Sequence, residues 1–171
     1  LGLLSLTPAL GSCEVSRALF LDVETTGLGG GTGNKAFLVG MCWLDVGSRR
    51  WTLEQLLLRE PDDEPALLAV VRERVAAASF IVSYNGKAFD VPLLVERMAM
   101  NRLPELESRP QLDLLHLVRR VHRRRTWRKS LTTVEHEVLG FRRGADIDGE
   151  EVAARYRHFL RSGDLRLLDD V

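Results

Sequence analysis

Cysteine is nearly absent from this chain of 171 residues, which contains only Cys13 and Cys42. Two cysteines are too few for the disulfide framework of a small secreted domain, and they are not spaced as a zinc-binding pair. The chain also lacks Cys-x-x-Cys, His-Glu-x-x-His and Gly-x-Ser-x-Gly sequences, and its four histidines have no metal-ligand spacing to one another. These absences leave a reduced, intracellular protein as the default, and we expect it in the cytoplasm.

Long hydrophobic runs and a net charge are lacking as well. The Leu-rich start is too short to span a membrane, and without an initiator Met or a basic flank it does not resemble a signal peptide. We therefore expect no membrane partner, and a start at Leu1 suggests a piece of a longer protein. Lys plus Arg and Asp plus Glu both number 24, so the whole molecule is not a polycation. The length and the 45% hydrophobic content predict one globular domain over residues 1–171.

The most informative stretch is Ala18–Leu28, an apolar run that ends in two acidic residues and a glycine turn. Apolar side chains alternate along it, so Asp22 and Glu24 point to the same face of a buried strand. Two charges at the end of such a strand are costly unless something neutralises them. Carboxylate ligands favour magnesium or manganese over zinc. We predict a divalent metal site here; the alternative is that both residues simply begin a solvated loop.

The glycine-rich segment 25–35 raises the question of a nucleotide site. A P-loop requires Ser or Thr directly after its Lys, whereas Ala36 follows Lys35. A dinucleotide fingerprint is matched in letters from Gly31 to Ala36, but residues 37–44 that follow are typical of a strand and not of a helix. No nucleotide cofactor is therefore expected, and we interpret the loop as a hairpin connection beside the metal site.

The remaining pattern predicts a mixed α/β fold. Strands at 37–44 and 50–59 would form an antiparallel meander with the first strand before any helix begins. A helix opens at Pro61, and the acidic residues 62–64 are interpreted as its first turn and not as a second metal site. A buried strand is expected at 80–84, and helices are expected from Asp90, from Asp113, from Ser130 to Gly140 and over 150–160.

A third carboxylate follows the strand at 80–84. The stretch Tyr84–Leu94 leads from that strand through a turn into a helix that begins near Asp90. Asp90 would lie close to Asp22 if the two strands were neighbours. By itself Asp90 is interpretable as a helix N-cap, but together with Asp22 and Glu24 it is better explained as a metal ligand.

Positive charge is concentrated in residues 102–143, which hold 11 Lys or Arg against 5 Asp or Glu. Asp113, within this region, is interpreted first as a helix cap and second as a site residue. The run Arg119–Lys129 includes Trp127, so it could hold phosphates while the indole stacks on a base. A solvated helix end is the alternative for this run.

Two of these stretches resemble known exonuclease motifs. Phe20–Leu28 resembles the first motif of the ribonuclease H-like DEDD superfamily, and Tyr84–Asp90 resembles its second. Four residues separate Asn85 from Asp90, as in the YprB-like predicted exonuclease family, whereas proofreading-type members have three. Four further segments resemble that family, namely Gly29–Gly33, Leu112–Arg120, Trp127–Leu131 and Asp146–Tyr156. The likeness runs from about Leu19 to Val171.

The resemblance implies a ribonuclease H-like fold, with a mixed sheet, an antiparallel three-strand meander and flanking helices. It implies a 3′-to-5′ exonuclease that acts on DNA or RNA and uses two Mg²⁺ or Mn²⁺ ions. In that scheme Asp22 bridges the ions, Glu24 holds the ion that activates water, and Asp90 serves the second ion. A nucleic-acid-binding module with the same fold and impaired catalysis is the rival class, and a structural or interaction domain is a third.

The resemblance also implies which residues contact the terminal nucleotide. Thr25, Thr26 and Leu28 would lie beside it, and Asn85 would contact it or brace the turn. The superfamily's third motif supplies a last aspartate preceded by Tyr at four residues or His at five, and no Asp after residue 150 meets either spacing. The expectation is therefore a piece that lacks the fourth ligand and the usual general base.

Overall fold

The computed structural model describes residues 2, 7–27, 33–125, 127–144, 147–169 and 171. Its centre is a five-stranded sheet with the order β3-β2-β1-β4-β5. The strands are β1 (Ala18–Thr25), β2 (Ala36–Asp45), β3 (Arg50–Leu57), β4 (Phe80–Ser83) and β5 (Gln111–Asp113). β1 pairs antiparallel with β2 and β2 antiparallel with β3, whereas β4 is parallel to both β1 and β5. The predicted meander and the mixed α/β class are confirmed.

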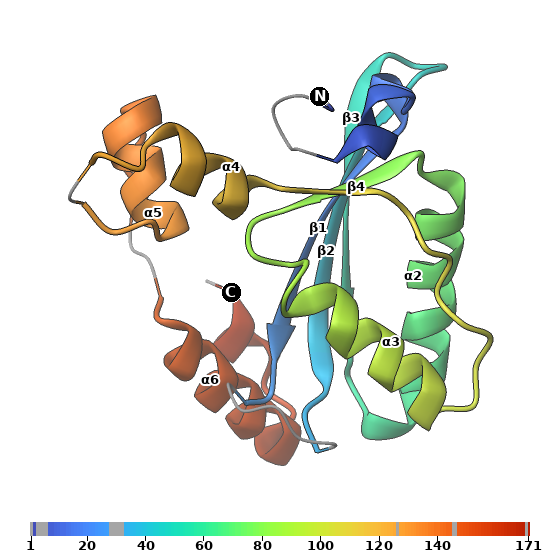
Figure 1. The fold of residues 1–171 in the computed structure, drawn as a ribbon. Helices are drawn as coiled ribbons and strands as arrows, with labels where there is room; N and C mark the ends of the chain where they lie inside the picture. The colour runs from blue at the N-terminus through green and yellow to red at the C-terminus, as the bar shows by residue number, and fades with distance from the viewer. Residues whose placement is uncertain (1, 3–6, 28–32, 126, 145–146, 170) are drawn as a thin grey trace.

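Helices cover both faces of this sheet (Figure 1). The α-helices are α2 (Glu64–Ala77), α3 (Asp90–Met100), α4 (Leu114–Val121), α5 (Leu131–Val134) and α6 (Gly149–Ser162). A π-helical stretch, η4 (Glu135–Leu139), continues α5. Short 3₁₀ turns are η1 (Pro8–Gly11), η2 (Val15–Arg17), η3 (Pro61–Asp63) and η5 (Leu165–Leu168). None of the described helices has the length and hydrophobicity of a membrane span.

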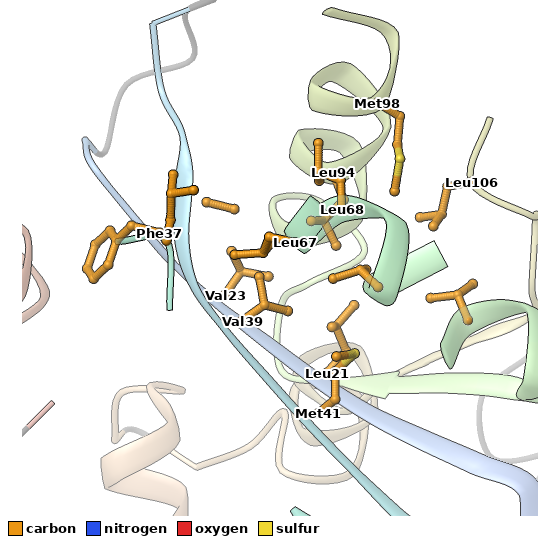
Figure 2. Packing of buried hydrophobic residues seen from close by; sticks show 14 of the residues in the cluster. Leu21, Val23, Phe37, Val39, Met41, Leu67, Leu68, Leu94, Met98 and Leu106 are labelled. Carbon is orange, nitrogen blue, oxygen red and sulfur yellow. The ribbon is translucent and has the colours of Figure 1, made fainter. Parts of the chain in front are cut away.

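The main core lies between the sheet and helices α2 and α3. On β1 the side chains of Leu19, Leu21 and Val23 are at most 9% exposed, which confirms the predicted alternation. Figure 2 shows Leu21 and Val23 packed with side chains from β2, α2 and α3. Asp22 and Glu24 therefore lie on the other face, toward α4, α5 and α6 (Figure 1), and we call it the carboxylate face.

Helix α6 packs against the start of β2 and the residue that follows β3. The ring of Tyr156 stacks on Phe37 with centroids 4.0 Å apart, and its hydroxyl donates to the carbonyl oxygen of Leu58 at 2.8 Å. Burial raises the pKa of Tyr156 to about 12, so the hydroxyl stays a hydrogen-bond donor. Gly163 ends the helix at φ 72°, a left-handed conformation that suits glycine. The helix predicted over 150–160 is confirmed and is slightly longer.

The acidic segment at Pro61 is a helix start, as predicted, but its last member has a further role. Glu64 is 2% exposed and accepts two hydrogen bonds from Arg97, both at 2.6 Å. Lys35 lies 3.2 Å from the same carboxylate. Burial alone would raise the pKa of Glu64, but hydrogen bonds from these cations and from Asn101 outweigh it and hold the pKa below its usual value. The pair joins the start of α2 to α3.

The predicted helix from Ser130 to Gly140 is confirmed in its limits. Gly140 ends it at φ 66°, the left-handed conformation expected of a C-terminal glycine. The Ser130 side chain makes no hydrogen bond to the backbone of the first turn; its hydroxyl pairs with that of Thr133 at 2.7 Å. The helix thus begins where the sequence predicts, without the side-chain cap.

Candidate active site at the end of β1

The first two carboxylates lie two residues apart near the end of β1. Asp22 is paired in register with Gly40 of β2, so no neighbouring side chain fills the space beside it on that strand. The register shifts between Glu24 and Thr25, and Thr25, which still pairs with Ala36, is the last residue of β1. Asp22 and Glu24 therefore project together from the carboxylate face at the position where β1 ends.

The third carboxylate, Asp90, comes shortly after β4, the parallel neighbour of β1. It is the first residue of α3, and Phe89 occupies the N-cap position without a side-chain cap bond. The interpretation of Asp90 as a helix cap is therefore wrong, because the chain enters the helix one residue earlier. Burial raises the pKa of Asp90 to about 7, with further contributions from the charges of Asp22, Asp113 and Glu24, in that order. The carboxylates at the end of β1 and the start of α3 are thus close enough to repel one another.

Asp113 holds the turn that carries the second motif. Its carboxylate caps α4 by accepting the N–H of Leu115 at 3.0 Å, which confirms the cap prediction. The same carboxylate accepts the N–H of Asn85 at 2.9 Å and that of Lys87 at 3.3 Å. Asn85 is in the left-handed region at φ 70°, where asparagine is tolerated better than most residues. Asp113 therefore fixes the loop between β4 and α3 through the backbone N–H groups of Asn85 and Lys87.

Gly86 lies in this loop where no larger residue fits. A Cβ atom there would lie 2.6 Å from Oδ2 of Asp90 and 2.7 Å from both Cβ and Oγ of Ser83. Ser83 is 5% exposed, and its hydroxyl has no hydrogen-bond partner among the described residues. The missing side chain of Gly86 thus lets the Asp90 carboxylate pack closely against the end of β4.

We expect Gly86→Ala to destabilise the protein, because the added methyl group overlaps the Asp90 carboxylate and the body of Ser83. Overpacking of this kind costs about 1–3 kcal/mol, or roughly 2–12 °C in melting temperature for a chain of this size. Gly11→Ala is the matched control, because a Cβ at Gly11 meets nothing within 4 Å. Thermal unfolding of both variants measures the effect, and equal melting temperatures would contradict the close packing of Asp90.

Burial also raises the pKa values of the two β1 carboxylates. For Asp22 the main cause is desolvation, opposed by the N–H of Val23 and by the charge of Arg143. For Glu24 the causes are desolvation and then the charge of Asp22. All three carboxyl groups are therefore destabilised as anions, and a positive charge placed among them would stabilise their ionised forms.

The raised pKa of Asp90 predicts a pH-dependent stability. Between pH 3.8 and about 7 the folded protein keeps a proton on Asp90 that the unfolded chain has released, so stability falls as pH rises through this window. Asp90→Asn removes that loss and should raise the melting temperature at pH 8 by roughly 2–8 °C, allowing for solvent screening. At pH 4 the two proteins should unfold at nearly the same temperature. A gain of the same size at both pH values would contradict the prediction.

A cavity of about 450 Å³ opens beside Glu24 and Asp90. Its walls come from the end of β1, the start of α3 and the start of α6; they are Val23, Glu24, Thr25, Gly27, Asn34, Ala88, Phe89, Asp90, Pro92, Leu93, Glu96, Gly149 and Ala153. Asp22 is not in the wall and lies on the adjoining sheet surface. The cavity has the size of a small-ligand site and carboxylates at one side.

The donors suit a hard divalent cation in their chemistry. They are carboxylate oxygens, and the net effect of their surroundings disfavours their anionic forms. Among the residues that the structure describes, no three His, Cys, Asp or Glu side chains are grouped closely enough to hold a metal ion as they stand. Asp22, Glu24 and Asp90 thus fit such an ion by donor type, and binding it requires their side chains to draw together.

The other predicted site residues have structural contacts. The Thr25 hydroxyl donates to the carbonyl oxygen of Gly27 at 2.8 Å, and Thr25 also lines the cavity. The Thr26 N–H donates to the carbonyl oxygen of Lys35 at 3.1 Å, and the Thr26 hydroxyl accepts the Lys35 N–H at 3.0 Å. Leu28 and residues 29–32 of the glycine-rich loop lie outside the described residues. Of the predicted nucleotide contacts, Thr25 faces the cavity and Thr26 closes the base of the loop.

The basic run after α4 folds onto itself around Trp127. The ammonium nitrogen of Lys129 lies 3.8 Å from the centre of the indole, and the His122 ring lies 5.4 Å from it. The Tyr84 hydroxyl donates to the carbonyl oxygen of Lys129, which ties this run to the end of β4. A base stacking on the indole face that Lys129 covers would therefore compete with Lys129, a competition that the sequence does not reveal.

Comparisons with known proteins show which family and fold this chain resembles. Residues 19–171 match the sequence profile of the RNase H superfamily. The chain is 42% identical to the uncharacterized protein YprB of Bacillus subtilis (strain 168) over 158 residues, which are 91% of this chain and 38% of that protein. It therefore spans less than half the length of this relative. The fold is similar to part of the family B DNA polymerase from the hyperthermophilic archaeon Pyrobaculum calidifontis, with a TM-score of 0.66 and 19% identity over 92% of this chain and 23% of the polymerase.

Proposed function

The chain belongs to the RNase H superfamily and, within it, to the YprB-like family, and from this membership we propose that it is a metal-dependent nuclease. The proposed reaction is hydrolysis of phosphodiester bonds from the 3′ end of DNA or RNA, with release of nucleoside 5′-monophosphates. The observation that supports the proposal is the electrostatic influence of Asp22 and Glu24, near the end of β1, on Asp90 at the start of the helix that follows the neighbouring parallel strand β4. A superfamily with a nuclease-type fold supplies the context for reading these carboxylates as catalytic.

The three carboxylates have distinct proposed roles. Asp22, on the open sheet surface, would hold both of two Mg²⁺ or Mn²⁺ ions, Glu24 would hold one and Asp90 the other. When bound, such a pair of ions lowers the pKa of water and offsets charge on the scissile phosphate. The chain itself contributes rigid placement: β1 fixes Asp22 and Glu24, and the turn held by Asp113 fixes Asp90.

The cavity gives the terminal nucleotide a place beside these carboxylates. Glu24 and Asp90 lie at one side of it, and Thr25 is in reach on the same wall. The first turn of α3, with Phe89, and the start of α6, with Gly149, form other walls. A nucleotide lying here would have its phosphate near the carboxylates and its sugar and base against the predominantly apolar remainder.

One observation favours a second candidate, a nucleic-acid-binding module without hydrolysis. The described carboxylates are not grouped closely enough to hold an ion as they stand. In such a module the basic residues would carry the binding and the carboxylates would be a remnant. The two candidates differ in whether any divalent ion supports turnover.

A direct test follows the cleavage of single strands labelled at the 5′ end, in Mn²⁺ and in EDTA. The proposal predicts a ladder that shortens from the 3′ end, Mn²⁺-dependent release of nucleoside 5′-monophosphates, and no cleavage in EDTA. A strand blocked by a 3′-phosphate should be cut more slowly. Retention of intact strands at every Mn²⁺ concentration, together with measurable binding of those strands, would establish the second candidate instead.

A further inference from the structure

An exposed apolar patch lies on the carboxylate face, beside Asp22. It consists of Phe20 on β1 and Trp51 and Leu53 on β3, which are 39%, 63% and 69% exposed. The rings of Phe20 and Trp51 meet edge to face with centroids 5.7 Å apart. We call these three residues the strand patch. Two aromatic rings and a leucine held open to solvent on a rigid sheet need a partner or a functional reason.

The register of the sheet places the strand patch next to the carboxylates. Phe20, Cys42 and Leu53 are paired across three strands and form one row, and Asp22, Gly40 and Gln55 form the next row on the same face. Two residues along a strand correspond to about 7 Å. That length is comparable to the span of one nucleotide in an extended single strand. A single-stranded nucleic acid whose 3′ end lies at Asp22 can therefore place the bases on the 5′ side of that end over Phe20 and Trp51.

The charge around the strand patch suits a polyanion. The turn that leads into β3 ends at Arg49, and Arg50 is the first residue of that strand; both arginines are exposed at the end of the strand where Trp51 lies. Asp45, across from Arg50, accepts hydrogen bonds from Gly47 and Ser48 and so is directed into its own turn. The opposite face of the sheet is filled by α2 and α3 (Figure 1), so the carboxylate face alone can offer this surface.

We propose that the strand patch is a base-stacking track for single-stranded nucleic acid, which leads the strand into the site at Asp22. This inference rests on the proposed function and names its substrate class as single strands. Aromatic rings bind any base through its π-face, while arginines near the track contact phosphates. A duplex cannot stack its paired bases on these rings, so the track selects single strands without reading their sequence.

The test measures binding of oligothymidylates of two and eight nucleotides, and of a blunt duplex, in EDTA to prevent hydrolysis. Trp51→Ala should weaken binding of the eight-mer about 5- to 100-fold and leave the two-mer unchanged, because only the longer strand reaches the track. Trp51→Phe should restore most of the affinity. Val95→Ala is the matched control, since Val95 is 45% exposed on α3, which covers the opposite face.

The outcomes separate this proposal from the proposed function. Equal eight-mer affinity in Trp51→Ala and Val95→Ala would overturn the track, whether or not the wild-type protein hydrolyses strands. Loss of affinity in Trp51→Ala supports the track even if the protein hydrolyses nothing with any divalent metal. Absence of hydrolysis would reject only the proposed nuclease activity. Size-exclusion chromatography tests whether the wild-type protein dimerises through the strand patch. A dimeric wild-type protein and a monomeric Trp51→Ala variant, with equal affinity for the eight-mer, would assign the patch to a protein contact and overturn the track.

Discussion

Asp22→Asn is expected to lower the Mn²⁺-dependent hydrolysis of single strands at least about 10³-fold while the protein remains folded. The substitution keeps the size of the side chain and removes the charge that both ions would share. It also removes a source of repulsion, because the charge of Asp22 contributes to the raised pKa values of Glu24 and Asp90. The melting temperature should therefore stay the same or rise. Initial rates at matched Mn²⁺ concentration measure the loss.

Asp62→Asn is the control for this experiment. Asp62 is an exposed acidic residue of η3, so this substitution removes one negative charge outside the candidate site. Its activity should equal that of the wild-type protein. Substantial activity in Asp22→Asn would show that hydrolysis, if present, does not depend on this carboxylate, and the catalytic assignment would be wrong.

Arg97→Ala is expected to produce the largest loss of stability. Glu64 would remain buried at 2% exposure without the two hydrogen bonds from Arg97. Breaking a buried pair costs about 3–5 kcal/mol, and Lys35 remains near Glu64, so a value near the lower limit is expected. This corresponds to roughly 6–12 °C in melting temperature. Chemical and thermal unfolding measure it.

Two further variants show whether the cost arises from an unpaired buried charge. The double variant Glu64→Gln, Arg97→Met removes both charges and should recover part of the loss. Arg166→Ala removes the surface partner of Asp164, which makes two hydrogen bonds of similar geometry in solvent, and should change little. A double variant as unstable as Arg97→Ala would point to packing by the arginine side chain and not to the charge.

The strands of this fold were predictable because their residues alternate with a period of two. In β1 the alternation of leucine and valine with Asp22 and Glu24 fixes which face is buried, whatever the rest of the chain does. The helix end at Gly140 was predictable because glycine adopts the left-handed conformation readily, and Gly163 ends α6 in the same way, beyond the predicted limit at residue 160. These are local preferences, and local sequence is sufficient to indicate them.

The contacts between distant residues were not predictable in the same way. Asp113 has the appearance of a cap in the sequence, and only the pairing of β4 with β5 brings it to the N–H groups of Asn85 and Lys87. The Glu64–Arg97 pair spans two helices, and an acidic first turn gives no sign of its partner. An asparagine, a lysine or an aspartate carries no information about which distant group it will meet, so these contacts require the fold.

In the candidate site, too, some features follow from local sequence and others require the fold. The sequence predicted Asp22 and Glu24 on one face and Asp90 near them, and the register of β1 with β4 explains the approach. The helix-cap interpretation of Asp90 failed because Phe89 takes the cap position, a shift of one residue that pattern analysis does not resolve. The exposure of Phe20 was hidden as well, because an aromatic residue in an apolar run is typical of a core.

Mn²⁺ binding shows whether Asp22, Glu24 and Asp90 together hold divalent cations. Electron paramagnetic resonance or calorimetric titration gives the affinity of the wild-type protein, Asp22→Asn, Asp90→Asn and Asp62→Asn at pH 8, where Asp90 is ionised. The wild-type protein and Asp62→Asn are expected to bind Mn²⁺ alike, and the other two variants are expected to bind it at least about tenfold more weakly. Equal affinities in all four proteins, or no binding by the wild-type protein, would contradict a shared cation site at these carboxylates.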